Sequence, residues 1–406
     1  MTEARRVNDQ PCLGVPNFPL CDPPRKLSRV SEIVAHDIFS GVPTRLRWND
    51  DGVTVSVDRV RSAPPDLWLA PPLFDIQING YAGVDFQHDG VTAKELVHAA
   101  GKLRESGCTR FLLTLITDEW DRLLARLAHY RKLRSKSPQL QQAIAGWHIE
   151  GPFLSAEPGF CGAHDPKLMI DPKIEQIDQL KKLTGNDPLL LTIAPERMDA
   201  VATISHAASL GIKVSLGHTN APRKRLTQAL KAGATGFTHL GNGCPKDLDR
   251  HDNILWRVFE TPGITVSLIP DTIHVSASLF RLIHRTVGRE NIIYVTDAMA
   301  AAGAGPGKYR LGRLELEVGN DQIVRLPGSP NFAGSALEPI DAILRAAEML
   351  HCSWRDIWRN YSELPGKFIG VEHELRAGAR ADFCLIEFAE PNQVLGLKTY
   401  LAGKSS

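Results

Sequence analysis

The sequence lacks the features of a membrane protein and of a disulfide-bonded secreted protein. No apolar run approaches the roughly 20 residues of a transmembrane helix, and no charged stretch followed by an apolar one opens the chain. The seven cysteines are odd in number, widely scattered and without a CxxC pair, which favours free thiols over disulfides or a thiolate zinc cluster. We therefore expect a soluble, cytoplasmic protein without a membrane partner.

An excess of charge of one sign is lacking as well. The 406 residues include 47 basic and 46 acidic side chains, which gives a formal net charge of +1 with neutral histidines. Such a balance offers no general attraction to nucleic acid, and we expect no nucleic acid as a partner. Any ligand must therefore be selected by a local site.

The chain divides into segments of different composition. Residues 1–27 are rich in proline and polar residues and lack periodicity, which predicts a flexible N-terminal arm. Residues 28–70 contain alternating β-type stretches such as DGVTVSVDRV, and residues 371–406 include the β-type stretch RADFCLIEF. These two segments are predicted to form one small β-sandwich domain, beside a larger domain of residues 71–370.

The larger domain contains eight apolar, β-branched runs, most of them separated by helical patterns. The runs are LFDIQING, TRFLLTLIT, AIAGWHIEG, PLLLTIAPE, IKVSLGHTN, TGFTHLGNG, GITVSLIPD and NIIYVTDAM. Apolar strands that alternate with helices predict an α/β fold with a parallel sheet, and eight of them favour a closed (β/α)8 TIM-type barrel. After the eighth run, YRLGRLELEVGNDQIVRL predicts a hairpin that turns at Gly319 and Asn320.

Polar side chains end several of these strands, at the edge where a barrel has its catalytic mouth. Glu150 ends the third strand, His218 the fifth, His239 the sixth and Asp297 the eighth, while His274 follows the seventh. A buried carboxylate is costly alone, but one carboxylate and two imidazoles that converge can share a divalent metal such as Zn²⁺. The alternative for each residue is a hydrogen-bonded position at the barrel rim.

Other histidines are weaker candidates. His148 lies two residues before Glu150 on the same strand face, where its deeper position favours a structural or supporting role over a ligand role. Histidines on helical or loop patterns, such as His373, are expected to be structural or exposed.

Several sequence blocks together resemble a known family. The blocks are LFDIQINGYAGVDF, HIEGPFLS, GAHDP, SLGHTNA, THLGNGCP, IPDTIHV and VTDAMAAAG, in this order. They resemble the N-acetylglucosamine-6-phosphate deacetylases of the amidohydrolase superfamily, and the GARADFCLIEF ending is typical of amidohydrolase chains. The resemblance implies hydrolysis of the N-acetyl group of N-acetylglucosamine-6-phosphate by a metal-activated water, which yields glucosamine-6-phosphate and acetate.

The resemblance also implies roles for individual residues. Glu150, His218 and His239 would bind the metal. Asp297 would be the catalytic acid and base, and His164 would polarise the acetyl carbonyl.

Substrate contacts follow from the same resemblance. The residues that would hold the amino sugar are Gln77, Asn242, Gly243 and His274. Arg250 would meet the phosphate, across the subunit interface of a homodimer. The alternative for Arg250 is a surface salt bridge with Asp247 or Asp249.

The number of metals can also be inferred from the resemblance. Many amidohydrolases carry an HxH motif after the first strand and bind a second metal there, but this chain has Gln77 and Asn79. The resemblance therefore implies one divalent ion per chain, with Zn²⁺ expected first and Fe²⁺ as an alternative.

The exact substrate stays open at this point. THLGNGCP carries Gly241, Gly243 and Cys244 where the family commonly has a large residue, alanine and methionine, which alters the floor of the sugar pocket. A deacetylase or cyclic-amide hydrolase with another substrate is one alternative. A non-catalytic barrel scaffold is the other, although a scaffold needs none of the metal and acid/base residues.

Overall fold

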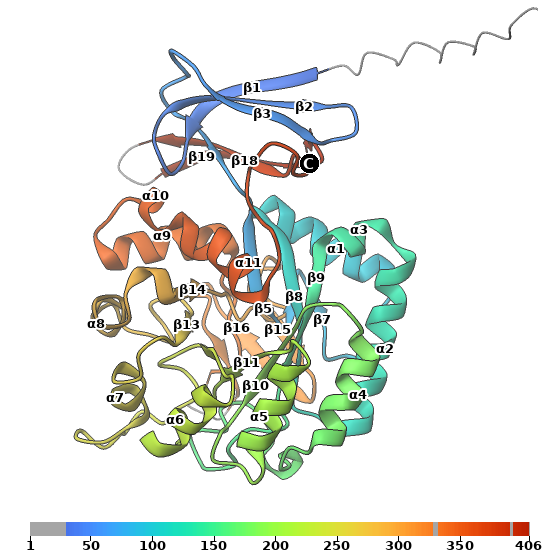
Figure 1. The fold of residues 1–406 in the computed structure, drawn as a ribbon, viewed down its shortest axis with the longest axis vertical. Helices are drawn as coiled ribbons and strands as arrows, with labels where there is room; N and C mark the ends of the chain where they lie inside the picture. The colour runs from blue at the N-terminus through green and yellow to red at the C-terminus, as the bar shows by residue number, and fades with distance from the viewer. Residues whose placement is uncertain (1–29, 328–331, 390–392, 406) are drawn as a thin grey trace, which may run out of the picture.

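The computed structural model describes residues 30–327, 332–389 and 393–405 (Figure 1). The predicted arm, residues 1–27, lies outside the described residues. None of the helices in the described part of the chain combines the length and apolar character that a membrane crossing requires.

A seven-stranded sheet lies at one end of the molecule and contains strands from both ends of the described chain (Figure 1). Its order is β20-β19-β18-β4-β1-β2-β3. The strands are β1 (Val30–Asp37), β2 (Pro43–Asn49), β3 (Thr54–Arg59), β4 (Leu67–Ala70), β18 (Phe383–Ala389), β19 (Gln393–Leu401) and β20 (Lys404–Ser405). Because β18 pairs antiparallel with β4, the predicted association of the early and late β segments is confirmed. The exact division into residues 28–70 with 371–406 and residues 71–370 stays a prediction.

The second sheet holds eight parallel strands in the order β14-β13-β12-β11-β10-β9-β8-β5. They are β5 (Leu73–Ile78), β8 (Cys108–Ile116), β9 (Ile144–Glu150), β10 (Leu189–Ile193), β11 (Lys213–Leu216), β12 (Gly236–Phe237), β13 (Thr265–Leu268) and β14 (Ile292–Tyr294). A parallel bridge between Ile78 and Ala298 joins the first strand to the chain just beyond the last. The predicted (β/α)8 barrel is confirmed.

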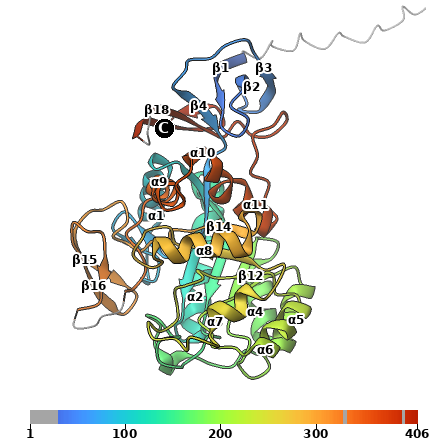
Figure 2. The same ribbon diagram turned by 90° about the vertical axis from the view of Figure 1, so that its left-hand side faces the viewer.

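Helices surround this sheet (Figures 1 and 2). They are α1 (Ala93–Glu105), α2 (Trp120–Lys136), α3 (Pro138–Ala143), α4 (Ile174–Thr184), α5 (Ala200–Ser209), α6 (Arg223–Lys231), α7 (Ile254–Phe259), α8 (Ala277–Val287), α9 (Pro339–Leu350), α10 (Trp354–Ile357) and α11 (Glu363–Ile369), with short 3₁₀ turns η1 (Pro166–Leu168), η2 (Arg289–Asn291) and η3 (Trp358–Tyr361). Sequence signals set their limits: α1 begins at a capping box in which Thr92 and Glu95 exchange hydrogen bonds.

Two small sheets complete the fold. β6 (Gly80–Tyr81) pairs with β7 (Val84–Asp85). β15 (Gly307–Leu311), β16 (Leu314–Val318) and β17 (Val324–Arg325) form an antiparallel sheet that projects from the side of the barrel (Figure 2).

The prediction of one hairpin turning at Gly319 and Asn320 is therefore incomplete, because an earlier turn separates β15 from β16. Leu311 faces Leu314 across a two-residue connection, and Gly312 within it has a φ of +58°, a backbone region that glycine adopts without strain.

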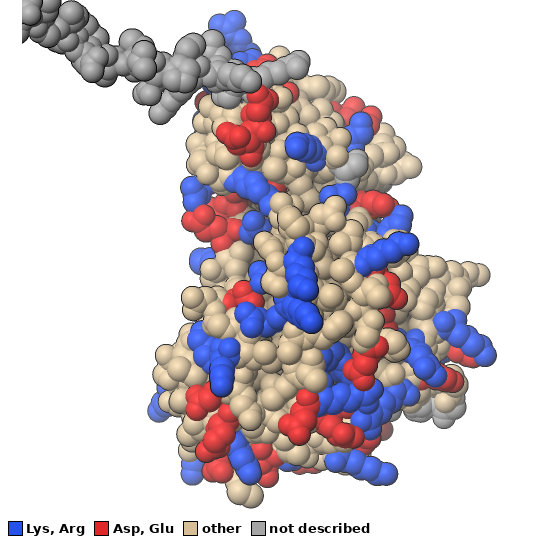
Figure 3. Space-filling model, turned by 90° about the vertical axis from the view of Figure 1, so that its right-hand side faces the viewer, with Lys and Arg blue, Asp and Glu red and all other residues tan. Residues whose placement is uncertain are grey.

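The surface carries charges of both signs. On the face shown in Figure 3, acidic and basic side chains are interspersed. This distribution agrees with the balanced composition of the chain.

Candidate active site

Ligand-type side chains meet at the carboxyl ends of the barrel strands. Glu150 is the last residue of β9, and His218 and His239 follow shortly after β11 and β12. Oε1 of Glu150 lies 2.8 Å from Nε2 of His239 and 3.4 Å from Nε2 of His218, and all three side chains are buried. The structure thus brings the three predicted metal ligands together.

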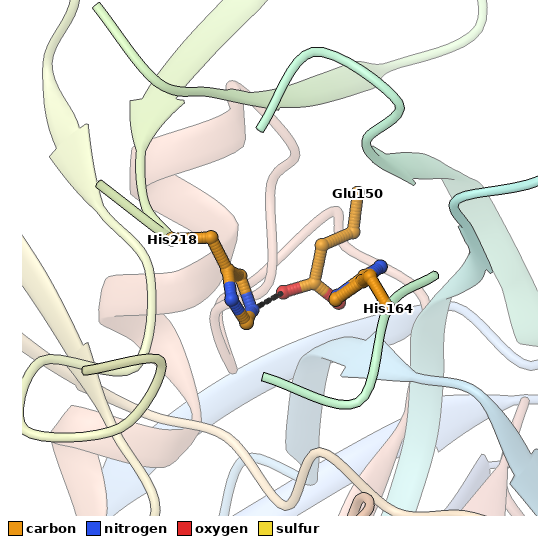
Figure 4. A group of neighbouring side chains, drawn as sticks. All are labelled: Glu150, His164 and His218. Atoms are coloured by element: carbon orange, nitrogen blue, oxygen red, sulfur yellow. Dashed lines mark ion pairs between the residues drawn. The ribbon is translucent and has the colours of Figure 1, made fainter. Parts of the chain in front are cut away.

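His164 belongs to the same group (Figure 4). The candidate ligand atoms of Glu150, His164 and His218 all lie within 4.8 Å of one another. His164 comes from the loop after β9, and its Nδ1 lies 2.9 Å from the hydroxyl of Thr117, which leaves Nε2 for the site. The geometry alone therefore admits either His164 or His239 as the third ligand beside Glu150 and His218.

A hydrogen bond and close backbone packing fix the ring of His218. Its Nδ1 lies 2.8 Å from the carbonyl oxygen of Phe160, which can only accept, so Nδ1 carries the proton and Nε2 faces the site. A Cβ atom at Gly162 would lie 2.8 Å from Cε1 of this ring, and one at Gly243 would lie 2.9 Å from Nδ1. Gly243, predicted to hold substrate through its backbone, thus packs against His218.

The backbone at these strand ends is unusual. His218, His239 and Asp297 have φ values of +48°, +34° and +52°. Such left-handed conformations cost non-glycine residues on the order of 1–3 kcal/mol each and gather at functional sites. Their occurrence at three neighbouring strand ends indicates a site that the surrounding fold holds in place.

Asp297 lies beside the metal-type cluster and is held by two amides. Nδ2 of Asn79 donates to Oδ1 of Asp297 at 2.7 Å, and Nε2 of Gln77 donates to the same atom at 3.0 Å. The Gln77 amide also lies 3.1 Å from each oxygen of Glu150, so it links both carboxylates. Because Gln77 is buried and its amide is engaged here, its predicted contact with substrate stays a prediction.

The two carboxylates ionise differently. Burial opposes the charge of Glu150, but the adjacent imidazoles of His218 and His239 outweigh it and hold the pKa of Glu150 well below its usual range. Burial, with the negative charge of Glu150, raises the pKa of Asp297 to about 7. Burial, together with the neighbouring His218, lowers the pKa of His164 to about 3, so this imidazole is neutral. One ionised carboxylate and one carboxyl that titrates near neutrality suit a ligand and a general acid/base, respectively.

A further buried carboxylate, Asp75 of β5, positions Gln77 and Asp297. Its Oδ2 accepts from the backbone N–H of Thr296 at 2.9 Å, from the Thr296 hydroxyl at 2.6 Å and from the Tyr361 hydroxyl at 2.5 Å. Its Oδ1 accepts from the backbone N–H of Gln77 at 2.9 Å. Thr296 directly precedes Asp297, so Asp75 ties the strand that carries Gln77 to the strand end that carries Asp297. Asp75 was not predicted to belong to the site, although a charge inside the apolar run LFDIQI was a usable signal.

The cavity above the cluster is narrow, about 50 Å³. Asn242 and His274, both predicted to hold the sugar, line it together with Phe332. Nδ1 of His274 lies 2.6 Å from Oδ2 of Asp271, which orients the ring.

Arg250 lies outside this cavity. Its side chain is exposed, and its Nε donates to Nε2 of His251 at 3.1 Å. Within the described residues it forms no salt bridge with Asp247 or Asp249. Its role toward phosphate stays a prediction.

His148 has the structural position expected from its depth. Its Nε2 lies 2.8 Å from the hydroxyl of Thr192 and its Nδ1 lies 3.4 Å from that of Thr114, inside the barrel. Burial lowers the pKa of His148 to about 4. The ring therefore acts as a neutral member of the barrel core.

The barrel, the carboxylate–imidazole cluster and the adjacent titratable carboxyl define a metal-dependent hydrolase of the amidohydrolase type. The N-acetylglucosamine-6-phosphate deacetylase of Bacillus subtilis (strain 168) is 30% identical to this chain over 346 residues, with 82% of this chain and 86% of the relative covered. The chain belongs to the N-acetylglucosamine-6-phosphate deacetylase family. The resemblance seen in the sequence is confirmed.

Other comparisons agree. The deacetylase of Mus musculus is 30% identical over 353 residues, covering 83% of this chain and 82% of the relative. A crystal structure of the Mycobacterium smegmatis deacetylase has a TM-score of 0.80 at 29% identity and covers 92% of this chain and 99% of that one. An aspartate-to-alanine variant from M. smegmatis, in complex with N-acetyl-D-glucosamine-6-phosphate, has a TM-score of 0.78 at 30% identity, with 89% and 94% covered. No protein-family model matches the chain.

Proposed function

We propose that this site hydrolyses the acetamido group of N-acetylglucosamine-6-phosphate to glucosamine-6-phosphate and acetate. The observation that carries the proposal is the place of Asp297, whose carboxyl adjoins a metal-type cluster and is held there by Gln77 and Asn79. Burial raises its pKa to about 7, which agrees with a role as acid and base. An amide needs an activated water, a stabilised oxyanion and a proton for the departing amine. The described residues of this cavity offer a group for each need.

The donor set fits one divalent ion held by Glu150, His218 and His239. Because Nδ1 of His218 donates to a carbonyl, the lone pair of its Nε2 faces Oε1 of Glu150 at 3.4 Å. Two acceptors at this distance repel each other unless a proton or a cation lies between them. Nδ1 of His239 is buried without a hydrogen-bond partner in the described structure, so no partner fixes the tautomer of this ring. Its Nε2 can therefore also present a lone pair to an ion beside Glu150.

A single ion, Zn²⁺ in the first place with Fe²⁺ as an alternative, agrees with the two amides beside the cluster. The N–H groups of Gln77 and Asn79 donate to the two carboxylates, and neither residue offers the imidazole nitrogen that an HxH pair would give a second ion. When bound, the ion would polarise the acetyl carbonyl and lower the pKa of water.

The protein side chains move the proton and stabilise the developing charge. Asp297 takes a proton from the attacking water and later delivers it to the amine nitrogen, so one carboxyl serves as base and then as acid. His164 is neutral, and Thr117 at its Nδ1 can donate to that nitrogen, which places the ring proton on Nε2. Nε2–H then donates to the carbonyl oxygen as it becomes negative.

Asn242 and His274 line the cavity and would contact the sugar hydroxyl groups. Arg250 would bind the 6-phosphate in a homodimer, where its exposed guanidinium could reach the cavity of a second subunit. The planar fork of arginine suits a phosphate group. The five described cysteines are free, which supports a cytoplasmic location.

The test is acetate release by the metal-loaded protein from N-acetylglucosamine-6-phosphate and from N-acetylglucosamine. We expect rapid release from the phosphorylated sugar and loss of activity after chelation, with recovery when Zn²⁺ or Fe²⁺ is added back. Absence of acetate release from a folded, metal-loaded preparation would refute the proposal.

A further inference from the structure

A second cavity, of about 350 Å³, lies where the barrel meets the seven-stranded sheet. Its walls include Arg110 of β8 and Arg380, which lies on the segment that connects α11 to β18 (Figure 1). None of its lining residues lines the catalytic cavity. It is therefore separate from the site of hydrolysis.

Arg110 is poorly compensated in this cavity. Its Nη1 donates to the backbone carbonyl of Glu372 at 2.9 Å, and no carboxylate of the described residues lies within salt-bridge distance of it. Burial lowers the pKa of Arg110, an effect that Asp382 opposes and the positive charge of Arg380 increases. Two guanidinium groups thus share one partly buried space.

Arg380 has an unused donor at the same place. Its Nε contacts both oxygens of Asp382, at 2.7 and 2.8 Å. Its Nη2 is buried and has no hydrogen-bond partner among the described residues. Buried donors in native proteins are normally paired, and charged ones are the most costly to leave unpaired. Among the described residues, Asp382 is the one carboxylate within salt-bridge distance of either guanidinium; the carboxylates of Glu372 and Glu374, which also line the cavity, form no salt bridge with Arg110 or Arg380.

We propose that this cavity binds a small oxyanion, a carboxylate or a phosphate group, between Arg110 and Arg380. One anionic group would offset the local charge of the two guanidinium groups and accept hydrogen bonds from both. The Glu372 carboxylate does not fill this role, because it pairs with Arg376 at 2.7 Å on the exposed side.

The bound anion would join the two parts of the fold. Arg110 belongs to the barrel, whereas the Arg380 backbone forms a bridge with Val53 beside the small sheet. An oxyanion that contacts both arginines would therefore stabilise the contact between barrel and sheet, and basal deacetylation should not require it.

The experiment is thermal unfolding of the metal-loaded protein in phosphate, acetate or chloride at constant ionic strength. At about ten times the dissociation constant, phosphate or acetate should raise the melting temperature by roughly 2 °C or more above chloride. The larger of the two shifts identifies the kind of oxyanion. Arg110→Gln and Arg380→Gln should lose most of this shift.

Arg376→Gln is the matched control, since Arg376 lies on the same segment, is not among the residues that line the cavity and pairs with Glu372. It should keep the full shift, and all three variants should keep basal activity. An anion that binds in the catalytic cavity would raise the melting temperature equally in every variant. A shift that only Arg110→Gln and Arg380→Gln lose therefore belongs to this second cavity. If Arg380→Gln does not fold, Arg110→Gln alone tests the proposal, because the wild-type Arg110 guanidinium makes one hydrogen bond to the protein. Equal shifts in all proteins, or no shift above chloride in the wild type, would overturn the proposal.

Discussion

Replacing Asp297 by asparagine should separate catalysis from stability. Oδ1 of Asp297 accepts from Gln77 and Asn79 at 3.0 and 2.7 Å, and the carbonyl oxygen of asparagine can keep both bonds. The fold and the metal site should therefore persist, whereas the amide cannot take or give the proton. We expect turnover to fall by about 10²–10⁴-fold, the range for a positioned acid/base group.

The same substitution should stabilise the metal-free protein at alkaline pH. Burial raises the pKa of Asp297 from 3.8 to about 7, with Glu150 adding to the effect. The native state thus holds this proton more tightly than the unfolded chain. Ionisation of Asp297 therefore leaves the free energy of unfolding unchanged below about pH 4 and lowers it by the full amount above about pH 7. At about 1.4 kcal/mol per pKa unit, that cost is on the order of 4 kcal/mol, and asparagine avoids it.

Single-turnover acetate release, metal content and unfolding of the metal-stripped protein at about pH 5 and pH 8 test both parts. Asp297→Asn should gain more stability over the wild type at the higher pH. Asp271→Asn is the control, because His274 overcomes burial and lowers the pKa of Asp271, so that variant should lose stability. Near-normal turnover with metal bound would contradict the proton role, and an equal stability change at both pH values would contradict the electrostatic account.

Three further predictions concern the metal and the substrate. Elemental analysis should find about one divalent ion per chain, and the His218→Ala, His239→Ala double variant should lose it; two tightly held ions would contradict the assignment. Arg250→Ala should reduce the preference for the 6-phosphate sugar by roughly ten- to a hundred-fold in kcat/KM, the effect of losing a charge-assisted contact. Gly162→Ala should lower metal affinity by about 10–100-fold, because its Cβ would lie 2.8 Å from the His218 ring and its φ is +58°. Metal titration checks that result, with Gly83→Ala as a control where φ is also positive but no atom lies within 4 Å.

The barrel and the strand-end residues could be predicted because they depend on a repeated local pattern. Each apolar strand ends in a polar residue, and parallel strands bring these ends to one edge. That rule places Glu150, His218, His239 and Asp297 near one another without knowledge of any loop. The structure brings all of them to one buried site.

Other parts depend on contacts between distant segments. The bond between Asp75 and Tyr361 spans 286 positions, and nothing local in either segment indicates its partner. The need for Gly162 arises only when the loop after β9 packs on the His218 ring. Arg250 can be evaluated only with a second subunit in place. The turn at Gly312 was missed because Gly319 and Asn320 are the stronger turn signal in the same stretch.

The pairing of β4 with β18 has a consequence for the order of synthesis. Leu67–Ala70 pairs with β1 on one side, but its other edge finds a partner only after residues 384–387 have left the ribosome, by which time all eight barrel strands have emerged. Until then β4 has an unpaired edge, a known hazard for association with other chains. A chain that stops before β18 would carry every residue of the catalytic cavity and still expose this edge. Such a truncated protein should aggregate during translation, so the last strands protect the nascent chain although they lie far from the reaction.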